Sequence, residues 1–172
     1  MQDPMIAMVL RLIHILAGIF WVGVAFVMAG FLLPSVRELG PEGGRFMEQL
    51  MVRRRLPIFL GAAMLLTVLS GFIMYGLLAS SSHGTWAGSA PGITYGIGGL
   101  AAILGAAVGA GVGSAAGRRM VALRQRFAEA GRPTPEQQAE IQRLQARMML
   151  GARLMAGLLA IAAGAMAVGR YV

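Results

Sequence analysis

Two side chains in the first long apolar stretch are of types that could do chemistry. His14 is the only ionisable residue between Leu12 and Leu33, and Arg11 precedes it by three residues. Residues three apart lie on the same face of a helix, so the imidazole and the guanidinium would be neighbours. Ionisable groups inside a membrane span usually face a bundle interior or a cavity, where they mark a site. We therefore expect a site at His14, with a plain hydrogen bond to a neighbouring helix as the simpler alternative.

The face of this helix that carries His14 also carries small residues beside one flat aromatic ring. Gly18, Trp21 and Ala25 follow His14 at helical spacing. The two small residues would leave room for a planar ligand to lie against the helix. A haem coordinated by His14 needs such room, with Arg11 near a propionate and Trp21 beside the ring. This makes His14 a candidate iron ligand and Arg11, Gly18 and Trp21 candidate cofactor contacts.

The composition indicates an integral membrane protein. Of 172 residues, 57% are hydrophobic and 13% are charged, against about 25% charged in soluble proteins. There is no cysteine, which excludes disulfides and thiolate metal sites, and no lysine, which excludes Schiff-base chemistry. The net charge of +8 comes from arginines concentrated in loops beside apolar stretches. Membrane topology explains this distribution better than nucleic-acid binding does.

Four apolar stretches, at about 5–33, 57–79, 93–116 and 148–168, are long enough to cross a hydrocarbon layer of about 30 Å. We expect the first to end at Pro34, and the second to open with Pro57 in its first turn. The first stretch exceeds the apolar region of a signal peptide, so we expect it to stay in the mature protein. The sequence therefore predicts an all-α fold, a single four-span domain over residues 1–172 that forms a four-helix bundle in the lipid bilayer.

The segments between the spans predict further helices. Residues 46–56 resemble a short amphipathic helix lying at the membrane interface. Residues 117–147 predict a cytoplasmic helical hairpin between spans three and four, closed at 131–134. Thr134, Pro135 and Gln137 have the types and spacing of an N-cap, a first-turn proline and a capping-box partner that open a new helix.

Small residues recur every fourth position in the last two spans. The third span has them at Gly105, Gly109, Gly113 and Gly117, and the fourth at Ala152, Ala156, Ala160 and Gly164. Lipid supplies no hydrophobic force between helices, so close backbone packing along such faces must hold a bundle together. We expect spans three and four to pack on each other. A homo-oligomer through Gly105, Gly109 and Gly113 is the second interpretation.

Arginine placement predicts the orientation in a bacterial-type inner (cytoplasmic) membrane. The first loop contains five arginines and residues 118–147 contain seven, whereas residues 80–92 contain none. By the positive-inside rule the first and third loops are cytoplasmic and both termini lie outside. Tyr75, Trp86, Tyr95 and Tyr171 then fall at the outer interface. His83 falls in the same outer half as His14, which makes it a second candidate ligand.

The first half of the chain resembles a known family. His14 followed by Trp21-Val22-Gly23, Pro34 and Arg37 is similar to the first helix of the copper-resistance D superfamily, which includes the J-type protoporphyrinogen oxidases. Span two, from Arg55-Leu56-Pro57 through Ser70-Gly71 to Tyr75, resembles their next helix. The resemblance implies a four-helix membrane bundle. For the oxidase branch it implies haem b held by His14 and a lysine in a later helix, and this chain has no lysine. For the copper branch it implies copper handling.

Three functions follow as hypotheses. The first is a membrane haem b protein that transfers electrons through a haem on His14 to an unknown redox partner. This hypothesis includes activity as a membrane oxidoreductase. The second is a copper-handling protein that uses His14, His83 and some of the thirteen methionines, because imidazole and thioether suit copper. The third is a structural or assembly subunit without a cofactor. A hydrolase lacks support, because no span contains a carboxylate.

Overall fold

The computed structural model describes all residues except 1–2, 114, 118, 121 and 124–133. The described part is all α-helical, and four of its helices are long and apolar enough to cross a membrane: 4–38, 56–81, 90–117 and 135–168. This confirms the four predicted spans as helices. The helices are α1 (Pro4–Val27), α2 (Leu33–Glu38), α3 (Pro41–Glu48), α4 (Leu56–Ser81), α5 (Ala90–Val108) and α7 (Pro135–Val168). Short π-helical segments follow α1, α3 and α5 at Met28–Leu32, Gln49–Arg53 and Gly109–Gly113.

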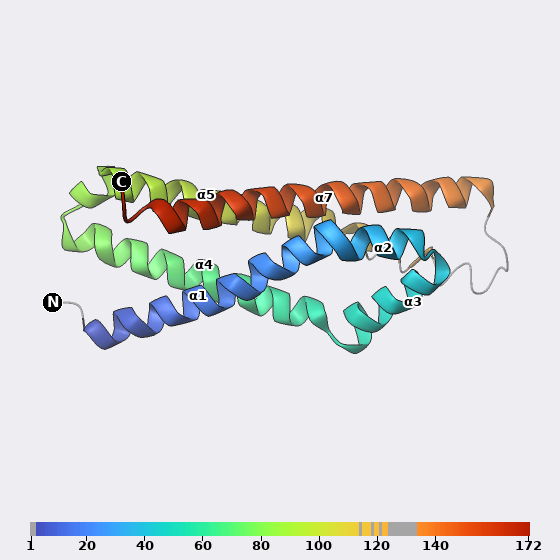
Figure 1. Cartoon of the computed structure of the whole chain (residues 1–172), viewed down its shortest axis with the longest axis horizontal. Coiled ribbons are helices and arrows are strands. Elements are labelled where there is room, and N and C mark those ends of the chain that lie inside the picture. The colour runs from blue at the N-terminus through green and yellow to red at the C-terminus, as the bar shows by residue number, and fades with distance from the viewer. Residues whose placement is uncertain (1–2, 114, 118, 121, 124–133) are drawn as a thin grey trace.

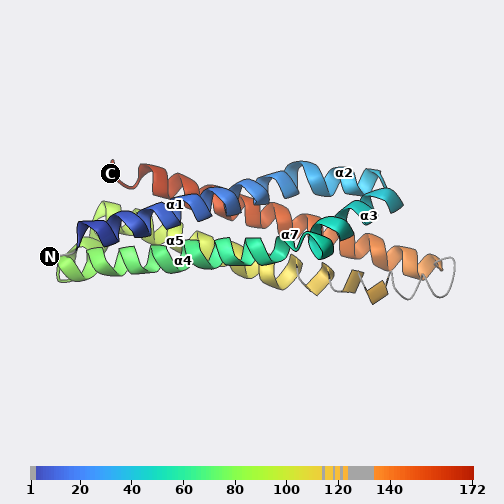
Figure 2. The same ribbon diagram turned by 90° about the horizontal axis from the view of Figure 1, so that it is seen from below.

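The four long helices form an antiparallel bundle in which each contacts two neighbours. α5 pairs most extensively with α7, and α1 with α4, while weaker contacts join α1 to α7 and α4 to α5. The diagonal partners α1 and α5 do not contact each other. Both termini lie at the same end of the bundle as the α4–α5 connection, which we call the termini end (Figures 1 and 2). Large apolar side chains such as Phe31 and Phe72 are exposed on the outside, as a lipid-facing surface requires.

The first span is longer than predicted, because Pro34 does not end it. The helix continues from α1 into α2 as far as Glu38. The π-helical segment Met28–Leu32 lies just before Pro34, and its wider turn joins the Leu33 N–H to the Met28 carbonyl instead of to the fourth carbonyl back. A π turn inserts one residue into an α-helix. Here it lets the chain pass a residue that has no N–H to donate.

The interhelical core is small and lies midway along the bundle. Trp21 and Ala25 of α1, Ala63 of α4 and Leu159 of α7 form its buried cluster. Leu159 is 1% exposed and Trp21 is 4% exposed. This cluster sets the level along the bundle axis at which α1 packs against α7.

Spans three and four pack as predicted, but only part of each small-residue face takes part. A side chain on Gly105 or Gly109 would meet Leu159 or Met155 of α7. On α7, Ala156 is buried, whereas Ala160 and Gly164 are exposed, so the predicted ridge is wrong in its second half. Leu159 fills the contact in its place, because its branched side chain enters the space that the α5 glycines leave. Gly105 and Gly109 thus pack against α7 within the chain, and the interpretation as a homo-oligomer face stays a prediction.

The segments between the spans show helices near the predicted positions. The capping box is confirmed: the Gln137 N–H donates to Thr134 Oγ1 and the Thr134 N–H donates to Gln137 Oε1 at 2.8 Å. The predicted interfacial helix begins earlier, at Pro41. Before the predicted hairpin turn, Ala116 and Met120 pack on Leu144, so the two arms lie together. The turn itself, predicted at 131–134, lies outside the described residues except for Thr134.

Candidate functional site

A cavity of about 840 Å³ lies among all four long helices in the half of the bundle toward the termini end. It falls in the size range of small-molecule and cofactor sites, about 300–1,000 Å³. Most of its lining is apolar. Its polar and small lining residues come from several helices: Arg11 and His14 on α1, Thr67 and Gly71 on α4, Tyr95 and Gly99 on α5. We call it the bundle cavity.

The His14 ring is fixed by the backbone of α4. Its Nδ1 lies 2.8 Å from the Thr67 carbonyl oxygen and 3.3 Å from Ser70 Oγ. A carbonyl oxygen can only accept, so Nδ1 carries the proton and donates it to Thr67. In a neutral imidazole this leaves a lone pair on Nε2. An N–H donated to a backbone carbonyl is the usual arrangement behind a metal-binding histidine, because it fixes both the tautomer and the ring orientation.

The other ring nitrogen of His14 is accessible from the cavity. Nε2 makes no hydrogen bond within the described part of the chain. Among those same residues, no buried side-chain nitrogen or oxygen lacks a hydrogen-bond partner. Since His14 is half-buried and lines the cavity, its Nε2 must have access to the cavity space. The lone pair is thus available to an electrophilic centre.

Gly71 provides the space that the His14 ring occupies. A Cβ built on Gly71 would come within 2.9 Å of His14 Cε1 and 3.3 Å of Nδ1. Real carbon atoms do not approach so closely, so any larger residue at position 71 would push the ring away from α4. The absence of a side chain therefore allows the short bond from Nδ1 to the Thr67 carbonyl.

The hydroxyls beside His14 are held by their own helix. Thr67 Oγ1 donates to the Ala63 carbonyl at 2.7 Å, and Ser70 Oγ donates to the carbonyls of Leu66 and Thr67. Both residues are buried. Because their protons are committed to backbone carbonyls, these side chains shape the pocket around the imidazole and do not donate into the cavity.

Arg11 brings a positive charge to the bundle cavity without a negative partner. Its side chain is exposed and lines the cavity beside His14. The cavity lining contains no carboxylate, and the ion pair that the structure contains among its described residues joins Arg119 to Glu140, far along the chain. A site with one free guanidinium and an apolar surface favours an anionic group on a hydrophobic body.

Two of the predicted contacts lie elsewhere. Trp21 is buried in the interhelical core and does not line the bundle cavity. Gly18 faces Thr67 of α4, whose Cγ2 would lie 3.6 Å from an added Cβ. The space that the sequence suggested beside Gly18 and Ala25 is therefore filled by α4 and α7. The glycines that border the cavity are Gly71, Gly96 and Gly99, and nothing lies within 4 Å of a Cβ built on Gly99.

His83 is not brought to His14. Its side chain is exposed, and it is not among the cavity-lining residues. Its backbone is left-handed, with φ of 51°, and its N–H donates to the Ser80 carbonyl where α4 ends. This conformation is typical of residues that end a helix. The structure gives His83 a place in the turn and no contact with the cavity.

Aromatic rings close the cavity near the termini end. The Trp86 ring makes an edge contact with Tyr75, with centroids 5.2 Å apart, and stacks on Tyr95 at 6.1 Å. All three rings line the cavity. The Tyr75 hydroxyl donates to the Gly92 carbonyl at 3.3 Å, which joins α4 to α5. Three of the four residues of the predicted aromatic belt thus form a packed group that borders the cavity, and Trp86 brings the α4–α5 connection into it.

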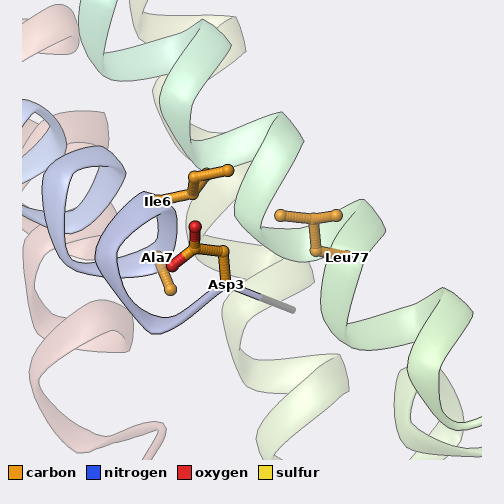
Figure 3. Close-up of a pocket in the computed structure, with 4 residues that line it drawn as sticks. All are labelled: Asp3, Ile6, Ala7 and Leu77. Atoms are coloured by element: carbon orange, nitrogen blue, oxygen red, sulfur yellow. The ribbon is translucent and has the colours of Figure 1, made fainter. Parts of the chain in front are cut away.

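A second, smaller cavity of about 130 Å³ lies between the start of α1 and the end of α4, and it is lined by Asp3, Ile6, Ala7 and Leu77 (Figure 3). Asp3 is already used there, since its carboxylate accepts the Met5 N–H at 2.9 Å as the helix N-cap. Within the described residues no group of three His, Cys, Asp or Glu side chains could hold a metal ion. The bundle cavity is therefore the stronger candidate site.

Comparison of the chain with protein-family models, with curated proteins and with solved structures found no match. The site consequently rests on its own geometry. Sequence reasoning identified His14 and Arg11 but not their surroundings on α4 and α5. One signal was present in the sequence: Thr67, Ser70 and Gly71 place two hydroxyls and a gap on one face of the second span.

Proposed function

We propose that this protein is a multi-pass haem b protein of a bacterial-type cytoplasmic membrane, in which His14 is an axial ligand and electron transfer is the task. The observation that carries the proposal is the accessible Nε2 of His14 beside a largely apolar cavity, with Nδ1 anchored to the Thr67 carbonyl at 2.8 Å. The resemblance of the first two spans to the copper-resistance D superfamily is consistent with this assignment through its oxidase branch, and with copper handling through its copper branch.

The residues of the bundle cavity fit a haem in three respects. A neutral imidazole with a fixed tautomer is a common haem ligand. The apolar lining suits the porphyrin, and Arg11 supplies a charge for a propionate. Gly99 leaves open space at one point of the α5 side, since nothing lies within 4 Å of a Cβ built there. A bound haem b would supply a one-electron iron couple; His14 would hold it, Arg11 would orient it, and the rings of Tyr75, Trp86 and Tyr95 would border it toward the termini end.

The test is the absorption spectrum of the purified protein, oxidised and reduced, with haem supplied during expression and metal analysis on the same sample. We expect a Soret band and a sharp reduced α-band in the wild type. His14→Ala should lose the pigment while the protein remains in the membrane. His83→Ala is the matched control, since it removes an exposed imidazole outside the cavity, and it should keep the full haem content. Full haem in His14→Ala would refute the assignment.

Copper handling is the second candidate, and one observation favours it. Met8, Met74 and Met166 line the same cavity as His14. Thioethers and an imidazole together form a soft ligand set suited to Cu(I). This function predicts bound copper that is lost in His14→Ala, with no porphyrin absorption. A colourless, metal-free sample would leave the third hypothesis, a cofactor-free assembly subunit.

A further inference from the structure

We infer that Met166 of α7 is the second axial ligand, opposite His14, so that the site holds a six-coordinate haem for electron transfer and leaves no open position for small molecules. This inference rests on the proposed function. It assigns a role to a residue in the last span, which the sequence reasoning left without one.

The side chains that could ligate iron lie on two sides of the bundle cavity. His14, Met8, Met74 and Tyr75 belong to the α1–α4 pair, and Tyr95 and Met166 belong to the α5–α7 pair. The His14 ring lies directly against Gly71 of α4. A residue that would hold the haem from the side of the cavity across from His14 would come from the other pair of helices, which offers Tyr95 and Met166.

Met166 lies at the same depth as His14. Trp21 and Leu159 belong to one buried cluster, so α1 and α7 are in register at that level. His14 precedes Trp21 by seven residues on α1, and Met166 follows Leu159 by seven residues on α7. Because the helices run antiparallel, both steps lead about 10 Å toward the termini end.

On each helix, the cavity residue also faces nearly the same direction as the core residue two turns away. Seven residues are almost two full helical turns, so His14 faces nearly the same way as Trp21 and Met166 nearly the same way as Leu159. At the level of the core these faces meet in a packed cluster. Two turns further out α1 and α7 separate (Figure 1), and the bundle cavity occupies that level, with both side chains in its lining. His14 and Met166 thus border the cavity at one level from different helices.

Tyr95 is the less suitable residue of the two. Its ring stacks on Trp86 and lies close to Gly169, where an added Cβ would be 2.9 Å from the ring. Gly169 is almost a full turn beyond Met166, so Tyr95 belongs to the aromatic group that closes the end of the cavity. Met166 has a flexible thioether side chain that is half-buried and borders the cavity. Its Cε lies against Gly98 of α5, 3.1 Å from where an added Cβ would stand, so binding of the iron requires a rotamer change that turns the sulfur toward His14.

Histidine–methionine ligation has a functional consequence. A thioether ligand raises the reduction potential of a haem, and two strong axial ligands favour electron transfer over ligand binding. The protein would then accept electrons readily and would not bind carbon monoxide at the reduced iron.

The experiment compares wild type with Met166→Leu, a change of similar volume that removes the sulfur. Each purified holoprotein is examined for spin state, for the near-infrared sulfur-to-iron band, for carbon monoxide binding and for reduction potential. We expect the wild type to be low-spin, to show the band and to bind no carbon monoxide. Met166→Leu should keep its Soret band, become high-spin, lose the near-infrared band, bind carbon monoxide and shift to a lower potential. Met166→His should restore the low-spin state without the sulfur band.

The matched control is Met155→Leu, which removes a thioether from the same helix outside the cavity lining. It should behave as wild type. A high-spin wild type, or a Met166→Leu protein that keeps its low-spin state and sulfur band, would overturn the assignment of Met166 while leaving the haem on His14 intact. A wild type without haem would refute the proposed function itself, and the ligand assignment with it.

Discussion

Gly71→Ala tests how His14 is held, and its effect can be worked out from the structure. The new Cβ would lie 2.9 Å from His14 Cε1, and an ordinary contact begins at 3.4 Å, so the ring must move by about 0.5 Å. The Nδ1 to Thr67 carbonyl distance is 2.8 Å, and a shift of that size along the bond takes it beyond the range of about 2.7–3.2 Å of a good hydrogen bond. The imidazole would then lose its fixed tautomer.

Loss of such a supporting bond typically weakens metal affinity by about 10–100-fold, or about 1.4–2.7 kcal/mol. We expect Gly71→Ala to bind haem more weakly by that factor. The assay is titration of the apoprotein with haem in detergent, followed by the Soret band. Gly76→Ala and Gly61→Ala are matched controls on the same helix, because nothing lies within 4 Å of a Cβ at either position. Both should bind haem as the wild type does.

Wild-type affinity in Gly71→Ala, with an unchanged spectrum, would refute the reasoning. It would mean that the Thr67 carbonyl does not orient the ligand. Melting temperature in detergent must be measured alongside, since overpacking alone costs about 1–3 kcal/mol. A protein that melts like the controls but binds haem weakly isolates the effect on His14.

The remaining predictions concern the bundle and its orientation. Gly98→Ala should destabilise the α5–α7 pair by about 1–3 kcal/mol, because its Cβ would meet α7 atoms at 3.0–3.3 Å. The control is the adjacent Gly99→Ala, whose Cβ meets nothing within 4 Å. Thermal unfolding compares the two proteins, and equal melting temperatures would contradict the packing of Gly98 on α7. Thr134→Ala should cost about 1 kcal/mol of helix N-cap stability, seen as faster hydrogen exchange in the first turn of α7 and not in its centre. The chain has no cysteine, so a single introduced cysteine reports on which side of the membrane it lies. An impermeant thiol reagent on intact cells should label Ser81→Cys and not Glu48→Cys. Labelling of Glu48→Cys alone would show that the predicted orientation is reversed.

The sequence predicted those features that depend on local pattern. Length and hydropathy located the four spans, and the residue types at 134–137 located the capping box, because both depend on neighbours along the chain. The extent of the first span was missed, since Pro34 normally ends a helix and a π turn before it leaves no clear mark in the sequence. The buried face of α7 was also missed. Its small residues suggested Ala160 and Gly164, whereas contact is made by Leu159, whose fit depends on a glycine in another helix.

The candidate site was predicted to a similar extent. His14 and Arg11 stand out because a polar group in an apolar span needs a reason. Their partners could not be derived, because the Thr67 carbonyl is a backbone atom that every residue has, and only the crossing of α1 and α4 selects it. Trp21 illustrates the converse. It lies two turns from His14 on the same face, but α1 and α7 have already converged at its level, so it packs in the core.

The π-helical segment Met28–Leu32 contains one residue more than an α-helix of the same length would. The packing of the first span therefore depends on how many residues this segment has, as well as on which they are. One residue rotates a helix by about 100°. Deleting a single codon within this segment would close the wide turn and leave His14, Arg11 and Trp21 in place, since all three precede it. Beyond the deletion α2 would turn to a new face, and α3 would turn with it, because Gly43 of α3 lies close to the Val36 backbone. The segment thus separates the chain into two units that mutation can alter independently: the unit that carries His14 and the unit that leads through α2 into α3.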